Sequence, residues 1–173
     1  MSGTTPDAEV PSLPDLAAIV QVLNRHRVAY VLIGGSAAQF SVPSLVTYDV
    51  DLSPATDQGN LQRLSAALDE LSARIRTEAV PEGLSFHHDG ASLGRSKMWN
   101  LQCAHGLLHI ALEPAGGGYD HLAQRARVVT VRGVEIPSPT WPTSSPPRGS
   151  PIGPRTNLSS PSLNRPSPTV APR

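Results

Sequence analysis

Apolar residues recur at helical spacing in two stretches of the chain. The first helix is expected over residues 12–26, where Ser12 or Asp15 can serve as the N-cap. Its apolar positions fall on one stripe: Leu13, Leu16, Ile19, Val20 and Leu23. The second helix is expected from the N-cap Asp57 through residues 60–76, NLQRLSAALDELSARIR. Its core-facing positions are Leu61, Leu64, Leu68, Leu71 and Ile75.

Between and after these helices, short apolar or alternating runs predict strands. Single strands are expected at 28–33, 47–53 and 84–88, and two short helices at 36–40 and 119–127. Residues 97–104 and 107–112 read as a hairpin around His105-Gly106, and 128–131 and 134–136 as a second around Arg132-Gly133. Interleaved strands and helices predict an α/β (α+β) fold, a mixed sheet with helices packed on it.

The stretch from Ile33 to Leu52, IGGSAAQFSVPSLVTYDVDL, is the one most suited to chemistry. Gly34 and Gly35 permit a sharp turn and a close approach to a ligand. Ser36 then lies in the first turn of a short helix, where free N–H groups favour a phosphate. Asp49 and Asp51 share one face of the following strand. Two neighbouring carboxylates repel unless a cation lies between them, and Mg²⁺ prefers such oxygen ligands together with substrate phosphates.

This combination resembles the nucleotidyltransferases of the polymerase-beta type. That superfamily carries a Gly-Gly/Ser turn followed by Asp-apolar-Asp/Glu-apolar, and here twelve residues separate Ser36 from Asp49-Val50-Asp51-Leu52. From about residue 16 to residue 137 the chain is more closely similar to small bacterial nucleotidyltransferases related to abortive-infection toxins. The helix at 60–76 and the segments MWNLQC and LEPAGGGYDHLAQRA also match.

The resemblance implies transfer of a nucleoside monophosphate from a nucleoside triphosphate to an acceptor. Two Mg²⁺ (or Mn²⁺) ions would be held by the catalytic pair Asp49 and Asp51, and Gly34, Gly35 and Ser36 would bind the β and γ phosphates. The acceptor is RNA, often the end of a tRNA, in toxin relatives, and a drug hydroxyl in antibiotic-modifying relatives. Toxin-like relatives are usually encoded beside an antitoxin, so a cognate antitoxin is an expected partner.

One metal position departs from the family pattern. Relatives supply a third carboxylate from a later strand, whereas this chain has His109 in LHIALEP. Imidazole is a poor ligand for Mg²⁺ and suits Mn²⁺ or Zn²⁺ better. Glu113 points to the same side but lies about 13 Å further along the strand. The alternative to an active enzyme is therefore a degenerate fold that binds nucleotide weakly or acts as a binding protein.

The run His87-His88-Asp89 has ligand-like residues, but the family pattern makes it a loop near the substrate.

Composition narrows the class of protein. The 173 residues suggest one domain, preceded by a flexible terminus at 1–11. Residues 1–136 hold all 14 acidic and 10 of the 14 basic residues, so no basic patch indicates nucleic acid by charge alone. Cys103 is the only cysteine, which excludes an intrachain disulfide and a Cys-rich zinc site. No signal peptide or membrane span is evident, which predicts a cytoplasmic protein.

The tail at 137–173 contains 11 of the 18 prolines, eight serines, four arginines and no acid. This composition predicts disorder, which leaves 12–136 as the folded domain. A proline-rich tail that binds a partner is a third, separate interpretation of the chain's function. A further hypothesis is that the reading frame shifted near Pro137, because codons can be chosen whose offset reading resembles the family. The nucleotide sequence of the gene would test this hypothesis.

Overall fold

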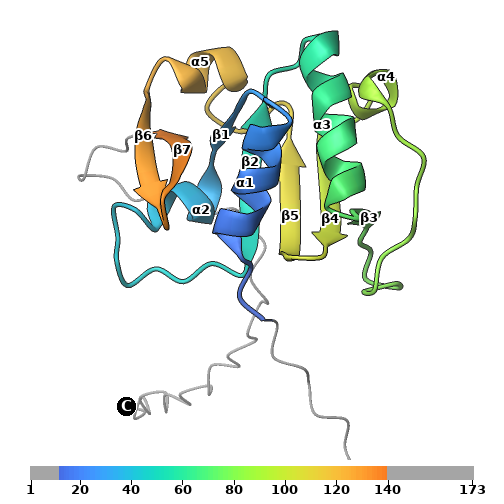
Figure 1. Ribbon diagram of the computed structural model, residues 1–173, viewed down its shortest axis with the longest axis horizontal. Helices are drawn as coiled ribbons and strands as arrows, with labels where there is room; N and C mark the ends of the chain where they lie inside the picture. Colours follow the sequence, from blue (N-terminus) through green and yellow to red (C-terminus); the bar gives the residue numbers. More distant parts are fainter. Residues whose placement is uncertain (1–11, 140–173) are drawn as a thin grey trace, which may run out of the picture.

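The computed structural model describes residues 12–139, which form a mixed five-stranded sheet, helices and a separate two-stranded sheet (Figure 1). The strand order of the large sheet is β1-β2-β5-β4-β3, in which β2 and β5 run parallel and the other pairs antiparallel. Helices α1 and α3 contact each other and lie over one face of this sheet. This arrangement confirms the predicted α/β class with helices packed on a mixed sheet.

The elements follow in chain order. They are α1 (Leu16–Arg25), β1 (Tyr30–Leu32), α2 (Gly34–Ala38), β2 (Asp49–Pro54), α3 (Gln58–Glu70), β3 (Arg74–Ile75), α4 (Gly90–Leu93), β4 (Met98–Cys103), β5 (Gly106–Ala111), α5 (Tyr119–Ala123), β6 (Ala126–Val131) and β7 (Val134–Pro139).

The core lies between the sheet and the helices. Alternate residues of β2 and β5 are buried there: Val50, Leu52, Leu108 and Ile110 are at most 1% exposed. The residues between them, Asp49, Asp51, Leu107 and His109, face the opposite side and stay partly accessible. Period-two alternation thus directs one set of apolar residues toward the helices and places Asp49, Asp51 and His109 together on the other face.

Side-chain caps start both long helices. Asp15 accepts from the N–H of Ala18 at 3.1 Å, and Asp57 accepts from the N–H of Asn60 at 2.9 Å. Each bond satisfies one of the N–H groups that a helix leaves without an internal partner. The choice between Ser12 and Asp15 is therefore settled in favour of Asp15.

The second helix is shorter than predicted. It ends at Glu70 with Leu71 as C-cap, and Ser72 adopts a left-handed φ of +53°. Ile75, expected on the helix, instead lies in β3 opposite Leu101 of β4. Pairing with the sheet edge therefore prevails over the helical pattern of the last six residues.

Asn60 joins α3 to the sheet from a fully buried position. Its amide accepts from the N–H of Ala29 at 2.7 Å and donates to the carbonyls of Ala29 and Ala55 at 2.9 and 2.8 Å. These bonds fix the start of the helix against the ends of β1 and β2, because a buried amide is costly to leave unpaired.

Several other predicted bounds differ. The helix expected at 119–127 ends at Ala123, and residues 126 and 127 belong to β6. The strand expected at 84–88 is reduced to a single bridge between Leu84 and Ile75, and α4 follows it unpredicted. Strand β7 continues to Pro139, with Ile136 and Ser138 at most 2% exposed, so the ordered hairpin passes the predicted domain limit at residue 136. The predictions for residues 1–11 and for the tail beyond residue 139 concern segments outside the described residues.

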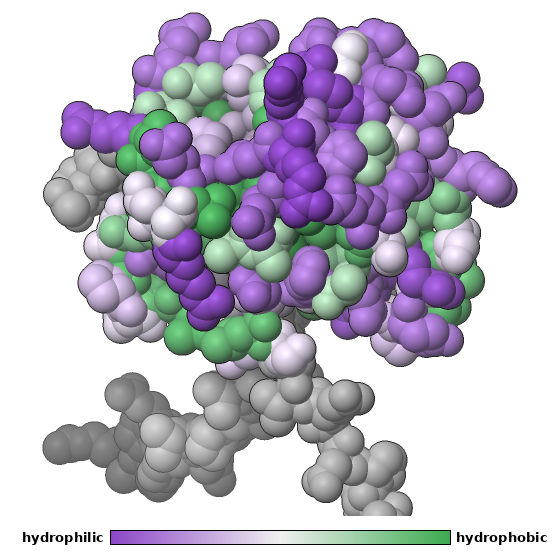
Figure 2. Space-filling view, in the orientation of Figure 1, coloured by the Kyte–Doolittle hydropathy of each residue, from purple (hydrophilic) through white to green (hydrophobic). Residues whose placement is uncertain are grey.

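The visible surface is mostly hydrophilic, with apolar side chains along its lower edge (Figure 2). The loop between α2 and β2 contributes four exposed apolar or aromatic residues: Val42, Leu45, Val46 and Tyr48. Within residues 12–139, no helix has both the length and the apolar character needed to cross a membrane.

Candidate functional site

Parallel pairing of β2 with β5 brings the two predicted carboxylates and His109 together. In the register of these strands Asp51 lies opposite His109, and Asp49 lies two residues earlier on the same face. His109 Nδ1 is 3.2 Å from Asp49 Oδ2 and 3.3 Å from Asp51 Oδ1. One donor atom from each residue lies within 4.8 Å of the other two, so a single cation could contact all three side chains.

The three side chains are partly buried, with exposed fractions of 30% for Asp49, 23% for Asp51 and 30% for His109. The hydrogen bond with Asp51 raises the pKa of His109 above its ordinary value. Partial burial and the charge of Arg76 oppose this rise in pKa, while the charges of both carboxylates add to it. Both carboxylates therefore favour the protonated form of the imidazole.

The glycine turn packs directly against this site. Gly34 has a φ of +56°, and a Cβ atom there would lie 2.6 Å from Asp51 Oδ2. A Cβ on Gly35 would lie 3.0 Å from Thr47 Oγ1. Gly34 thus combines a left-handed φ with the close approach of Asp51, and Gly35 leaves little room for a side chain beside Thr47.

Ser36 connects the short helix α2 to the carboxylate strand. Its side chain is fully buried; the hydroxyl donates to the carbonyl of Asp49 at 3.1 Å and accepts from the N–H of Asp51 at 2.8 Å. This pair of bonds holds the backbone on both sides of Val50. The hydroxyl is therefore committed within the protein, and only the backbone N–H of Ser36 could serve a phosphate.

Thr47 is a site residue that the sequence analysis missed. Its hydroxyl lies 2.8 Å from Asp49 Oδ1 and 3.2 Å from the Asp49 carbonyl oxygen, either of which can accept its single proton. The bond to the carboxylate would orient Asp49. The signal in the sequence was its position two residues before Asp49, which places it on the same side of an extended segment.

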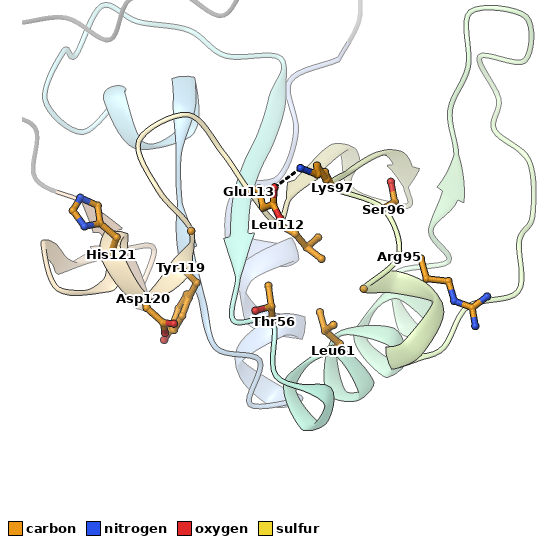
Figure 3. Close-up of a pocket in the computed structure, with 12 residues that line it drawn as sticks. Thr56, Leu61, Arg95, Ser96, Lys97, Leu112, Glu113, Tyr119, Asp120 and His121 are labelled. Atoms are coloured by element: carbon orange, nitrogen blue, oxygen red, sulfur yellow. Dashed lines mark ion pairs between the residues drawn. The ribbon is translucent and has the colours of Figure 1, made fainter.

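Glu113 is not part of this cluster. It lies beyond the end of β5 and forms an ion pair with Lys97 at 2.7 Å (Figure 3). The pair lines a cavity of about 540 Å³ between the loop after α4 and helix α5. The side chains of Thr56, Leu112 and Tyr119 also line this cavity. The structure therefore gives this glutamate a different environment from His109.

Two residues of the run His87-His88-Asp89 make structural contacts, and His87 is exposed. The side chain of His88 is only 4% exposed, its Nδ1 lies 2.8 Å from the hydroxyl of Ser65, and its ring packs on Phe86. Asp89 caps α4 by accepting from the N–H of Ser92, a bond that lowers the pKa of Asp89. Within residues 12–139, Asp49, Asp51 and His109 are the one set of three potential metal ligands found close together.

Sequence comparison found no matching protein-family model and no matching curated protein. The solved structures that are similar in fold include the following two. One is the Thermotoga maritima protein TM1012, whose assignment as a nucleotidyltransferase is provisional. The two chains are 15% identical with a TM-score of 0.47, and the match covers 72% of this chain and 74% of that one. The other is the antibiotic-resistance factor ANT(2'')-Ia, with 14% identity, a TM-score of 0.43 and coverage of 71% of this chain and 62% of that one.

Proposed function

We propose that this chain is a nucleotidyltransferase, which moves a nucleoside monophosphate from a nucleoside triphosphate to an acceptor hydroxyl. The observation that carries the proposal is the placement of Asp49, Asp51 and His109 around a single point, directly beside the Gly34-Gly35 turn. This arrangement supplies metal ligands and a backbone able to approach a triphosphate in one place. Pyrophosphate would leave when the acceptor oxygen bonds to the α-phosphorus.

The donor set fits a divalent cation. Asp49 and Asp51 would be the main ligands, with His109 as the third, because one atom of each already lies within 4.8 Å of the others. Bound Mg²⁺ or Mn²⁺ would offset charge on the triphosphate and lower the pKa of the attacking hydroxyl. Thr47 would orient Asp49 from behind through its hydroxyl, so the carboxylate would present its second oxygen to the ion.

The start of α2 would bind the phosphates. The first N–H groups of a helix have no internal partner, and here they belong to Gly34, Gly35 and Ser36. The Ser36 hydroxyl would contribute indirectly, because its bonds to the backbone of β2 fix α2 relative to the carboxylates. Because Gly34 and Gly35 have no side chains, phosphates bound at the start of α2 would lie close to the metal ligands.

The proposal also covers the acceptor of the nucleotide and the partner proteins. An RNA acceptor such as the end of a tRNA would correspond to toxin-type relatives, which would be accompanied by a cognate antitoxin. A small-molecule hydroxyl would correspond to antibiotic-modifying relatives.

A second candidate function follows from His109 itself. Its imidazole already lies 3.2 and 3.3 Å from the two carboxylates, which favour a proton on the ring. A chain that uses this contact in place of metal would bind nucleotide weakly without transferring it.

Incubation with α-³²P-labelled nucleoside triphosphates, Mg²⁺ or Mn²⁺, and either total RNA or a panel of aminoglycosides would test both candidates. Transfer of label by the wild type, and its loss in Asp51→Asn, would support the enzyme. Nucleotide binding by equilibrium dialysis with no transfer to any acceptor would support the binding protein. Absence of both binding and transfer would reject the two together.

A further inference from the structure

The third ligand position distinguishes this site from one built of carboxylates alone. Asp49 and Asp51 on β2 offer oxygen atoms, whereas His109 on β5 offers the ring nitrogen Nδ1. The site thus combines two hard oxygen donors with one borderline nitrogen donor. The identity of the preferred ion depends on this difference.

The spacing of the donors suits one ion. For bonds of about 2.1 Å, adjacent ligands of an octahedral ion lie about 3.0 Å apart, and for bonds of about 2.0 Å those of a tetrahedral ion lie about 3.3 Å apart. The distances from His109 Nδ1 to the nearer oxygens of Asp49 and Asp51 are 3.2 and 3.3 Å. The imidazole and each carboxylate are therefore already separated as neighbouring ligands of a single cation would be.

The nitrogen donor favours a transition metal. Mg²⁺ binds oxygen and gives up its water reluctantly, so exchanging a carboxylate oxygen for imidazole weakens its binding. Divalent first-row metals bind nitrogen more readily, with affinity rising from Mn²⁺ through Fe²⁺ and Co²⁺ to Cu²⁺. The same exchange therefore costs Mn²⁺ and Co²⁺ less than it costs Mg²⁺.

The charge of the ligands limits the number of resident ions. Two ionised carboxylates and a neutral imidazole carry a charge of about −2, which balances one divalent cation. A set of three carboxylates would carry one more negative charge and would tolerate a second cation better. Without nucleotide, the charge of the ligands thus favours one ion.

We infer that Asp49, Asp51 and His109 form a single-ion site that selects a borderline transition metal, such as Mn²⁺ or Co²⁺, over Mg²⁺. This inference rests on the metal site of the proposed function, although it requires neither nucleotide nor transfer. His109 is the residue that sets the selectivity. Asp49 and Asp51 supply affinity for any divalent cation.

Calorimetric titration of the full-length chain with Mn²⁺, Co²⁺ and Mg²⁺ separately, without nucleotide, tests the inference. We expect one ion per chain and at least about tenfold tighter binding of Mn²⁺ and Co²⁺ than of Mg²⁺. His109→Asp should tighten Mg²⁺ binding and shrink the ratio, whereas His109→Gln should weaken Co²⁺ without tightening Mg²⁺. His105→Gln, at an exposed turn histidine, is the matched control and should preserve the ratio.

The absorption spectrum of bound Co²⁺ provides a second measurement, because its visible bands report the ligands directly. The spectrum should change in His109→Gln and stay constant in His105→Gln. Equal affinities for Mg²⁺ and Mn²⁺ in the wild type, an unchanged spectrum in His109→Gln, or no metal binding at all would each overturn the inference.

The same variants separate this inference from the proposed function. Selective Mn²⁺ binding through His109 without nucleotide transfer would support the metal site and reject the enzyme. Transfer with equal metal affinities, and with Mg²⁺ binding unchanged by His109→Asp, would support the enzyme and reject the selectivity.

Discussion

The substitution Asp51→Asn should remove ligand stabilisation while changing the unliganded protein little. Asparagine retains an oxygen that can accept from His109, and it removes repulsion between two carboxylates on one strand face. The substitution also removes the charge attraction between Asp51 and His109, where Asp51 Oδ1 lies 3.3 Å from His109 Nδ1. Because these effects oppose each other at a partly exposed site, the free energy of unfolding without ligand should change by less than about 1 kcal/mol.

The ligand effect should be larger. A ligand that binds only the folded state stabilises it by about 2.7 kcal/mol at a hundredfold excess over its dissociation constant. For a chain of this length that corresponds to a rise in Tm of roughly 5–10 °C. Asp51→Asn removes one of two carboxylate ligands, so this rise should disappear in the variant.

Thermal unfolding by circular dichroism, with and without Mn²⁺ and a non-hydrolysable ATP analogue, would measure both effects. Asp120→Asn, on the exposed start of α5, is the control and should keep the wild-type rise. A wild type whose Tm is unaffected by the ligands would refute the reasoning, as would a variant that still responds. A variant that melts far earlier without ligand would show that Asp51 mainly supports the fold.

Three further predictions concern stability. Without metal, the hydrogen bond with Asp51 raises the folded-state pKa of His109 above its ordinary 6.5. The protonated imidazole therefore stabilises the fold fully below pH 6.5, and this stabilisation is lost as the pH rises through the folded-state pKa. Urea denaturation from pH 5.5 to 9 should show this decline in the free energy of unfolding, and His109→Gln should flatten it. Gly34→Ala should lower the free energy of unfolding by about 1–2 kcal/mol because of its left-handed φ, and it should also displace Asp51. Gly116 also has a positive φ but has open space around it. Gly116→Ala should therefore lower stability only through backbone strain and leave metal affinity unchanged. Asn60→Ala should lower the free energy of unfolding by roughly 2–4 kcal/mol, because it leaves buried backbone groups unpaired; a loss below about 0.5 kcal/mol in urea titration would contradict this account.

The sequence determined the local elements of the protein and the face on which its carboxylates lie. Helical spacing of apolar residues predicted α1 and most of α3, and alternation with turn residues predicted both hairpins. Asp49 and Asp51 had to share a face because side chains two apart on a strand point the same way. These properties depend on contacts between residues close in the chain.

Tertiary structure decided the properties that depend on distant pairing. Competition from β4 ended α3 at Glu70 and drew Ile75 into β3, which no local pattern could reveal. The resemblance placed His109 at a metal position, but only the parallel register of β2 and β5 set its imidazole between Asp49 and Asp51.

Burial likewise was settled by the fold as a whole. The hydroxyl of Ser36, expected near phosphate, bonds to the backbone of β2, and the hydroxyl of Thr47 reaches Asp49. A hydroxyl can bond to water, ligand or backbone with similar energy, so its partner depends on which group the packing brings within reach. The residue types in the sequence therefore limited the candidates for the site, and three-dimensional packing decided which side chains bond within the protein and which remain accessible.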